Sequence, residues 1–338
     1  MRTLFLALLC FGLLLPANSR AQETHIHGFT DFSFVASNKE DSKSAFQLGE
    51  YVLYVVSDLS DRISFLGETT FEYHDGFEVD VERVAFRYHL NNYLNFEIGK
   101  HHTPLGYWNT SYHHGTVLQP TVGRPIMLSF ENRGGIMPIH TVGVSVWGNL
   151  PSGIYYEFML GNGIGSTARS DNDESKSLAI AFHKDLNAVL RVGITGYFDR
   201  IAAGLPSFRR NDAGRIPLAA SVRQQSVGGN ARFKKDALEL LGEVMLVSNR
   251  SDLGDGATLG HYIYGGYQLG KVTPYVRFDQ LIFEDSEPYF LAEDANQFLM
   301  GLRFDLNFLA VIRLEYQTIG AENADTIGRF VFQVALGF

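Results

Sequence analysis

Histidines gather in one segment of the chain, between residues 100 and 140. Five of the eleven histidines fall there, as two adjacent pairs and a single position: His101, His102, His113, His114 and His140. Neutral imidazoles bind zinc and copper, so a metal site would follow if the pairs met. Adjacent residues of an extended strand point to opposite faces, so each pair supplies one ligand to a shared centre. No carboxylate or cysteine completes a recognised ligand spacing, and we assign no metal and no cofactor.

The same segment carries charges suited to a narrow opening. Three basic side chains, Lys100, Arg124 and Arg133, would face the acidic Glu131. Opposed charges across a constriction create a transverse field, which orients polar solutes and rejects apolar ones. Charged residues on the polar faces of predicted strands could line the wall: Arg62, Glu68, Glu72, Arg83, Arg87, Glu97, Arg277, Arg303 and Arg313. Alternatively, the basic side chains pair with carboxylates on neighbouring strands, and the two interpretations are compatible.

Aromatic side chains in this segment also allow two interpretations. Tyr107, Trp108 and Tyr112 could form an apolar contact for sugars, or they could be the packing core of a folded loop. We favour packing, because a long loop needs an apolar anchor to stay folded. In either interpretation, Trp108 is part of the predicted constriction, together with the histidines and the charged residues named above.

Catalytic constellations are not evident in the sequence. A Ser-His pair could be imagined from His140 and Ser145, but residues five apart on one strand lie on opposite faces. Nothing matches the Gly-x-Ser-x-Gly elbow of a hydrolase. We predict that the protein is not an enzyme.

The elements that would position these residues are β-strands. Alternation with a period of two recurs along the chain, and the 3.6-residue period of an amphipathic helix is almost missing. Charged residues regularly opposite aromatic ones need solvent, which the lumen of a membrane barrel supplies, although an open sheet with one wet face gives the same pattern. We predict roughly sixteen strands, near residues 25–36, 45–56, 62–73, 78–90, 93–101, 139–149, 153–161, 176–184, 188–199, 222–234, 237–248, 259–269, 271–282, 296–306, 308–319 and 327–338.

The connections favour the closed barrel. Tight turns at 91–92, 150–152, 185–187, 235–236, 270 and 307 alternate with longer loops at 37–44, 162–175, 200–221, 249–258, 284–295 and 320–326. This alternation is typical of an up-and-down, antiparallel transmembrane β-barrel. The longest non-alternating stretch, 103–138, is rich in Pro and Gly, which predicts a compact folded loop after the fifth strand.

The first residues predict a cleaved secretory signal. A positive start at Arg2, an apolar run over 4–15 and small residues at Ser19 and Ala21 place the cleavage after Ala21. The apolar run is shorter than the ~20 residues of a spanning helix. Residues 22–338 then form a single domain without cysteine. Loss of the two charges of Arg2 and Arg20 takes the formal net charge from −9 to −11, which argues against a nucleic-acid partner.

With this organisation the chain resembles the Gram-negative outer-membrane porin superfamily. The last strand places apolar residues on one face and ends in an aromatic residue, which resembles the signal read by the barrel assembly machinery: Phe330, Phe332, Val334, Leu336 and Phe338. In sixteen-stranded porins the third outer loop folds into the pore, and 103–138 falls at that connection. The resemblance implies a homotrimer in outer-membrane lipid.

A shorter resemblance lies at the beginning of this loop. The segment Gly99-Lys100-His101-His102-Thr103-Pro104-Leu105-Gly106 is similar to a motif of phosphate-selective porin-like proteins. Those proteins line the pore with basic residues, whereas this chain is acidic, so we leave the ion preference open. We expect passive diffusion of small hydrophilic or ionic solutes. The alternatives are a closed-lumen structural or adhesive barrel and an outer-membrane hydrolase.

Overall fold

The computed structural model describes residues 23–40, 42–73, 76–113, 115–130, 134–207, 216–321 and 324–338. The predicted signal, 1–21, lies outside the described residues. The strands are rich in β-branched and aromatic residues, and their bounds are β1 (Glu23–Ser37), β2 (Ala45–Ser60), β3 (Ile63–Tyr73), β4 (Phe77–His89), β5 (Asn95–His102), β6 (His140–Asn149), β7 (Ile154–Asn162), β8 (Lys176–Asp185), β9 (Leu190–Ile201), β10 (Val222–Lys235), β11 (Leu238–Ser251), β12 (Gly254–Tyr267), β13 (Val272–Phe283), β14 (Ala295–Asn307), β15 (Ala310–Ala321) and β16 (Ala324–Gly337). Between β5 and β6 lie a short helix, α2 (Tyr107–Tyr112), and a 3-10 turn, η1 (Ile126–Leu128).

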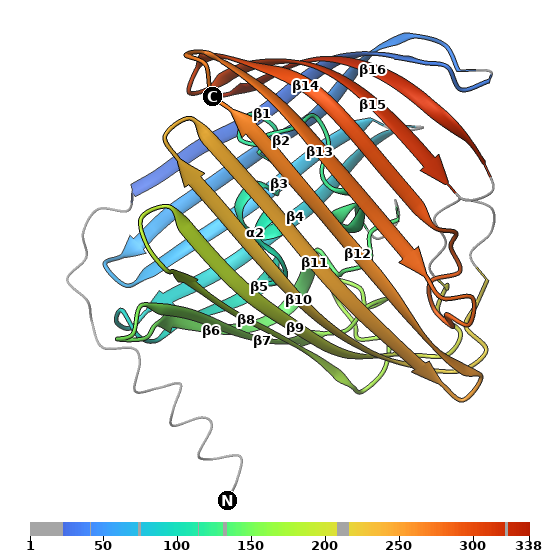
Figure 1. The fold of residues 1–338 in the computed structure, drawn as a ribbon. Helices are drawn as coiled ribbons and strands as arrows, with labels where there is room; N and C mark the ends of the chain where they lie inside the picture. Colours follow the sequence, from blue (N-terminus) through green and yellow to red (C-terminus); the bar gives the residue numbers. More distant parts are fainter. Residues whose placement is uncertain are drawn as a thin grey trace, which may run out of the picture.

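The strands form one closed antiparallel barrel (Figure 1). Each strand pairs with its neighbours in the sequence, and β1 closes the sheet on β16 with Phe34 opposite Phe332. The predicted all-β, up-and-down architecture of about sixteen strands is confirmed. Predicted strand bounds mostly differ from the observed ones by one to three residues; the largest difference is at β12, which begins at Gly254 instead of 259.

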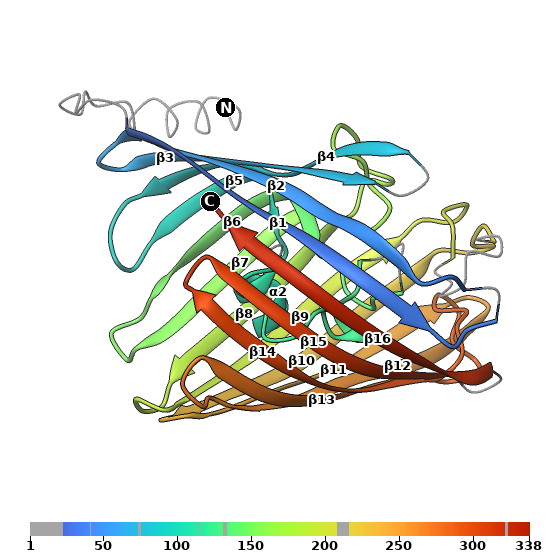
Figure 2. The ribbon, with the colours of Figure 1, turned by 90° about the horizontal axis from the view of Figure 1, so that it is seen from above.

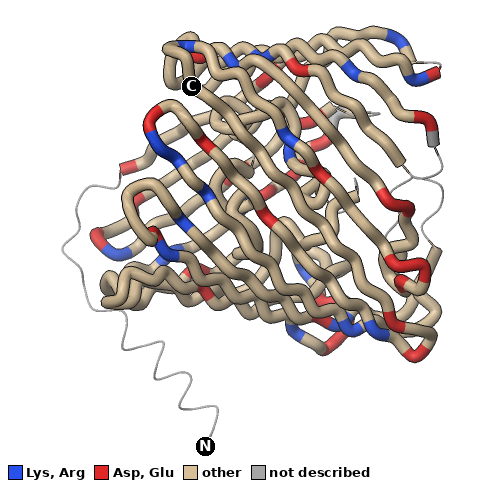
Figure 3. Tube along the Cα trace, in the orientation of Figure 1, with Lys and Arg blue, Asp and Glu red and all other residues tan. Residues whose placement is uncertain are grey.

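The two faces of the barrel differ as the alternation predicts. On β16, Phe330 and Leu336 are 41% and 42% exposed, whereas Val331 and Ala335 between them are 1% and 0% exposed and point inward. An apolar outer face with polar residues on the inner face suits a strand between lipid and water. Figure 3 shows acidic and basic residues gathered at the strand ends, with fewer along the middle of the strands. Within the described residues, no helix is long and apolar enough to span a membrane.

The two ends of the barrel differ in their connections. The end that carries the C-terminus has tight turns, such as that at Gly270, whose φ of +64° is a conformation that glycine adopts without strain. The opposite end carries the longer loops, including 163–175 and 284–294. Two predicted long loops are wrong. β11 and β12 extend to a tight turn at 252–253, because the flanking residues continue the strand pairing as far as Ser251 opposite Gly254. The predicted loop at 320–326 is also mostly strand, because β15 extends to Ala321, which pairs with Ala324 at the beginning of β16.

The segment between β5 and β6 fills part of the lumen. Figure 2 shows α2 inside the ring of strands. Leu105, Trp108 and Leu128 of this segment are buried. They form one apolar cluster with wall residues that include Met245 and Tyr262. The main apolar core of the protein thus lies inside the barrel, between this inward-folded loop and one side of the wall. These contacts place the described part of the loop after the fifth strand against the inner wall.

Candidate pore constriction

A carboxylate on the wall holds the beginning of α2. Glu243 on β11 accepts hydrogen bonds from the backbone N–H groups of Tyr107 (2.5 Å) and Trp108 (2.7 Å). The hydroxyl of Tyr262 donates to the same carboxylate at 2.6 Å. Backbone N–H groups at the start of a helix lack partners within the helix, and a negative charge there is favourable. Glu243 thus fixes the end of α2 that faces β11 and β12.

Arg277 on β13 anchors the middle of the inward-folded loop. Its guanidinium donates to Thr121 Oγ1 and to the carbonyl oxygens of Gly123 (2.6 Å) and Arg124 (3.1 Å). The side chain is almost fully buried, and Asp279 accepts from its Nε at 2.9 Å. A buried guanidinium needs both a counter-charge and acceptors for its donors, and the loop supplies the acceptors.

Two further wall arginines repeat this arrangement. Arg303 on β14 donates to the carbonyls of Gln119 (2.7 Å) and Val117 (3.0 Å), and Arg313 on β15 donates to the carbonyls of Thr116 (2.8 Å) and Gln119. Glu315 beside them accepts from the N–H of Val122 at 3.0 Å. Arg277, Arg303 and Arg313, which were predicted to line the wall, therefore hold the loop in place. Sequence reasoning missed this role, because the partners are more than 150 positions away in the chain.

The opposite side of the lumen holds two adjoining cavities. One, of about 280 Å³, is lined by charged and aromatic side chains that include Arg87, Glu97 and Glu157. The other, of about 330 Å³, lies between α2 and strands β1 and β2. Arg83, His102 and Thr110 line both. Residues from β4, β5 and the loop thus meet where the cavities adjoin, which is where the loop leaves space next to the wall.

The two arginines that line these cavities are paired with carboxylates. Arg83 contacts Glu68, and Arg87 Nη2 donates to Glu97 Oε1 at 3.0 Å. The arginines of β4 therefore both pair with neighbouring strands and line the lumen, so the two interpretations of the sequence hold together at these positions. Glu72 is half-buried on the same face of β3 as Glu68.

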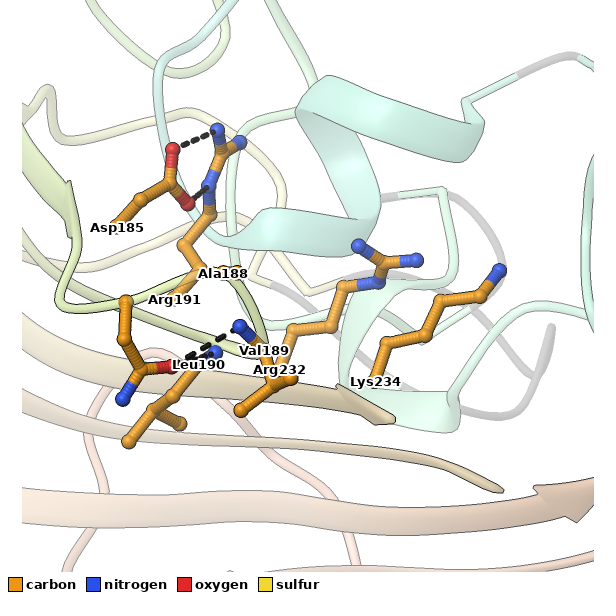
Figure 4. A pocket seen from close by; sticks show the side chains of 8 residues that line it. Asp185, Ala188, Val189, Leu190, Arg191, Arg232 and Lys234 are labelled. Carbon is orange, nitrogen blue, oxygen red and sulfur yellow. Dashed lines mark hydrogen bonds and ion pairs between the residues drawn. The ribbon is translucent and has the colours of Figure 1, made fainter. Parts of the chain in front are cut away.

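A third cavity, of about 430 Å³, lies at the short-turn end and was not found from the sequence. Figure 4 shows Arg191, Arg232 and Lys234 around it. Arg191 Nε donates to Asp185 Oδ1 at 2.7 Å, and Arg232 Nε donates to Glu239 Oε1 at 2.7 Å. The cavity is richer in bases than in acids. The lysines and arginines of β9 and β10 were visible in the sequence, but their meeting depends on strand register.

Other predicted constriction residues have different positions. His114, Glu131 and Arg133 lie outside the described residues. Lys100 pairs in register with the exposed Val84, and its Nζ donates to the carbonyl of Val81 at 2.8 Å and lies 3.6 Å from Asp80. The structure does not bring Lys100 into the group around His102. Arg62 is also apart, exposed in the β2–β3 turn.

The aromatic residues of the loop pack as favoured from the sequence. Trp108 is fully buried, with its ring 5.2 Å from that of Tyr112 and 5.9 Å from that of Tyr262. The guanidinium of Arg277 lies 5.6 Å from the Trp108 ring, within the range of a cation–π contact. Since no edge of Trp108 is exposed, its surface contributes to the core of the loop and not to the cavities.

A second loop, 284–294, also packs on the wall. Glu287 accepts from Asn249 Nδ2 (2.8 Å), from the Thr258 hydroxyl (3.2 Å) and from the backbone N–H of Tyr289 (3.0 Å). Burial raises the pKa of the Glu287 carboxyl, and these hydrogen bonds oppose the rise. Tyr289 and Phe290 extend from this loop into the apolar cluster.

A closed sixteen-stranded antiparallel barrel with a loop folded into its lumen is the fold of the bacterial outer-membrane porins. No protein-family model and no curated protein sequence matches the chain. Among solved structures it is similar to a loop L8 deletion mutant of OmpT, an outer membrane protein of Vibrio cholerae, with 13% identity over 94% of this chain and 100% of that chain and a TM-score of 0.69. It is also similar to an anion-selective porin from Comamonas acidovorans (12% identity, 94% and 100% covered, TM-score 0.69) and to Salmonella typhi OmpF in complex with daunomycin (11% identity, 93% and 97% covered, TM-score 0.64).

Proposed function

We propose that the protein is an outer-membrane channel for passive diffusion of small hydrophilic or ionic solutes. The observation that supports this most directly is the pair of cavities beside the inward-folded loop, one of them lined by charged side chains, within a closed barrel whose outer face is apolar. A closed barrel satisfies every backbone group in lipid, and a polar interior leaves a path for water. The porin fold of the similar structures supports the same proposal.

The proposed path runs beside the loop and is narrow. It passes Arg83, Arg87 and Glu97 at the level of α2 and continues to the basic cavity around Arg232 and Lys234. Charges of both signs lie along it, so we propose a selection by size and polarity with an ion preference set by these groups. In this proposal the constriction also includes the histidines and Arg124, and His114, Glu131 and Arg133 of the same loop remain candidates.

Single-channel recording tests this proposal. The folded protein is reconstituted in planar bilayers, and conductance and reversal potential in a salt gradient are measured for wild type and for Arg124→Ala and Arg87→Leu. We expect stable open steps, with a reversal potential that shifts toward cation preference in both variants. A folded barrel that gives no conductance would refute the channel and lead to assays for lipase, protease and adhesive activity.

A closed-lumen structural barrel is the second candidate. The observation that favours it is the extent of apolar packing inside the barrel, where the loop and wall share one buried cluster. Liposome swelling separates the two candidates: a channel admits small sugars and excludes larger ones, whereas a closed lumen admits neither. We propose no catalytic role for His140 and Ser145.

The cellular context follows from the same proposal. A signal over 1–21 would export the chain, leaving residues 22–338 as one domain in the outer membrane, with lipid around the barrel. Phe338, whose ring stacks on Tyr51 at 5.7 Å, would act with Leu336 and Val334 as the signal for the barrel assembly machinery. One similar structure is described as a trimer form of OmpT, and we propose a homotrimer here. Crosslinking of the protein in native membranes tests this assembly.

A further inference from the structure

Three histidines from three different elements meet at the base of the inward-folded loop. His102 ends β5, His113 follows α2 and His140 begins β6. One nitrogen atom from each ring lies within 4.8 Å of the other two. The ring centroids are 4.1 Å apart for His102 and His113, 4.4 Å for His113 and His140, and 5.2 Å for His102 and His140. We propose that these histidines form a binding site for a divalent transition-metal ion, with Zn²⁺ as the type case.

The donor set fits such an ion. Three imidazole nitrogens with one open position form a tetrahedral zinc site, and the same ligands suit copper, nickel and cobalt. Tetrahedral ligands at the usual Zn–N distance of about 2.0–2.1 Å lie roughly 3.3 Å apart. The nitrogen atoms that lie within 4.8 Å of one another would therefore need to approach by about 1.5 Å at most. His102 and His113 come from the first two histidine pairs, and the third ligand comes from His140.

The hydrogen bonds around the site orient His140 as a metal ligand. Its Nδ1 lies 3.0 Å from Oε2 of the buried Glu82. The β3–β4 pairing shifts register between Glu68 and Thr69, which leaves Glu82 in a bulge between paired residues. A carboxylate on one ring nitrogen keeps the proton there and leaves the other nitrogen to bind a metal, which is a common arrangement at zinc sites.

Asn109 orients the ring of His113 in the same way. The amide nitrogen of Asn109 donates to the carbonyls of Thr103 (3.0 Å) and Ile139 (3.3 Å), so its oxygen faces His113 Nδ1 at 3.2 Å. An amide oxygen can only accept, so this contact favours the tautomer with the proton on Nδ1, which leaves Nε2 as the ligand. Since Thr103 and Ile139 flank the two ends of the loop, this network ties the site to both adjoining strands.

Two charged side chains near the histidines have opposite effects on metal binding. Glu82 favours a bound cation, whereas Arg124, whose Nη2 lies 3.2 Å from His113 Nδ1, opposes it. The Arg124 guanidinium also lies 4.5 Å from the ring of Phe130. If metal binding fixes the proton on Nδ1, Arg124 can no longer donate there and must move. Removal of Arg124 should therefore strengthen metal binding, an effect that a purely structural histidine cluster does not predict.

The lumen gives access to the site. His102 lines both cavities at the constriction, and His113 lines the one beside α2. A bound ion would join β5, β6 and the end of α2 and so hold the loop against the wall. The binding itself does not depend on channel activity; its expected effect on conductance rests on the proposed function.

The test is Zn²⁺ titration of the folded full-length protein by calorimetry, together with Co²⁺ absorption spectra that report tetrahedral coordination. We expect one Zn²⁺ per chain, removable by EDTA. Glu82→Gln should weaken binding by about 10–100-fold, the usual effect of losing such an outer partner, and His113→Ala should weaken it more. Arg124→Ala should bind at least as tightly as wild type.

Matched controls keep the result interpretable. His183→Ala removes a histidine that stacks on Tyr155 at 4.3 Å, and the double change of His25 and His27 to alanine removes a second, exposed histidine pair. Both should leave the site intact. No Zn²⁺ binding by the folded wild type, or binding that survives in His102→Ala and His113→Ala, overturns the proposal. Zn²⁺ binding in a barrel without conductance supports the metal site and refutes only the channel, whereas EDTA-reversible block of conductance in wild type and not in His113→Ala supports both.

Discussion

Loss of Arg277 should release the inward-folded loop. The change Arg277→Leu replaces the arginine on β13 with a smaller, apolar side chain. It removes the hydrogen bonds to Thr121, Gly123 and Arg124. It also leaves Asp279 as a buried carboxylate without its guanidinium, in a part of the wall where that side chain is fully buried. Both effects disfavour the folded loop while the strand pairing of the barrel is unchanged.

The magnitude follows from the burial of the pair. Removing one partner of a buried ion pair costs about 3–5 kcal/mol. Because about 1.4 kcal/mol corresponds to a factor of ten in an equilibrium constant, the population of released loop should rise by about a hundred-fold to a few thousand-fold. Water that reaches Asp279 recovers part of this loss, so we expect a rise near the lower end of this range.

Single-channel recording measures the release. We expect larger or noisier open steps in Arg277→Leu than in wild type, and faster trypsin cleavage after Arg124 in the folded barrel. Arg87→Leu is the matched control, because it removes an arginine paired with Glu97 on the wall and not with the loop. It should alter ion preference without raising noise or cleavage. Equal conductance, noise and protease resistance in Arg277→Leu and wild type, with the barrel folded, would refute the anchoring argument.

Three further changes test other parts of the site. Glu243→Gln removes the charge at the start of α2 and should increase channel noise less than loss of Arg277, since one amide oxygen still accepts. Changing both Arg232 and Lys234 to Gln should shift the reversal potential toward cations, and an unchanged potential would place the basic cavity off the path. Burial raises the pKa of the Glu287 carboxyl above its value in the unfolded chain. The folded loop 284–294 therefore binds the proton of this carboxyl more tightly than the unfolded loop does. Its protease resistance should therefore fall as pH rises from the ordinary carboxyl range through the raised pKa, and Glu287→Gln should remove that dependence.

The sequence predicted the barrel because each strand carries its own signal. Alternation places Phe330 and Leu336 on the lipid face and Val331 on the lumen face, and this pattern needs no knowledge of distant residues. The tight turns are likewise predicted from residues that are adjacent in the sequence. The β11–β12 connection shows the limit of this reasoning, because polar and glycine residues such as Gly254 can continue a strand where pairing with Ser251 supports them.

The site was less predictable, because its contacts are distant in the sequence. The sequence showed arginines on polar faces, but nothing local distinguishes Arg313, which binds loop carbonyls almost 200 positions away, from Arg83, which binds Glu68 on the next strand. The histidines are similar: the β5–β6 register sets His102 directly opposite His140, and that register cannot be read from spacing alone. Residue types were therefore predictable, and their partners were not.

The inner wall is divided into two parts that use the same residue types differently. On β13 to β15 each arginine donates to carbonyl groups of the loop, and the Arg277 side chain is only 1% exposed. On β4 the Arg87 side chain is 35% exposed and faces a cavity. A buried, paired charge has little contact with a passing ion, whereas a partly exposed one interacts with it directly. Neutralising Arg87 should thus change selectivity with little effect on the loop, and neutralising Arg277 should change pore size with little effect on charge preference.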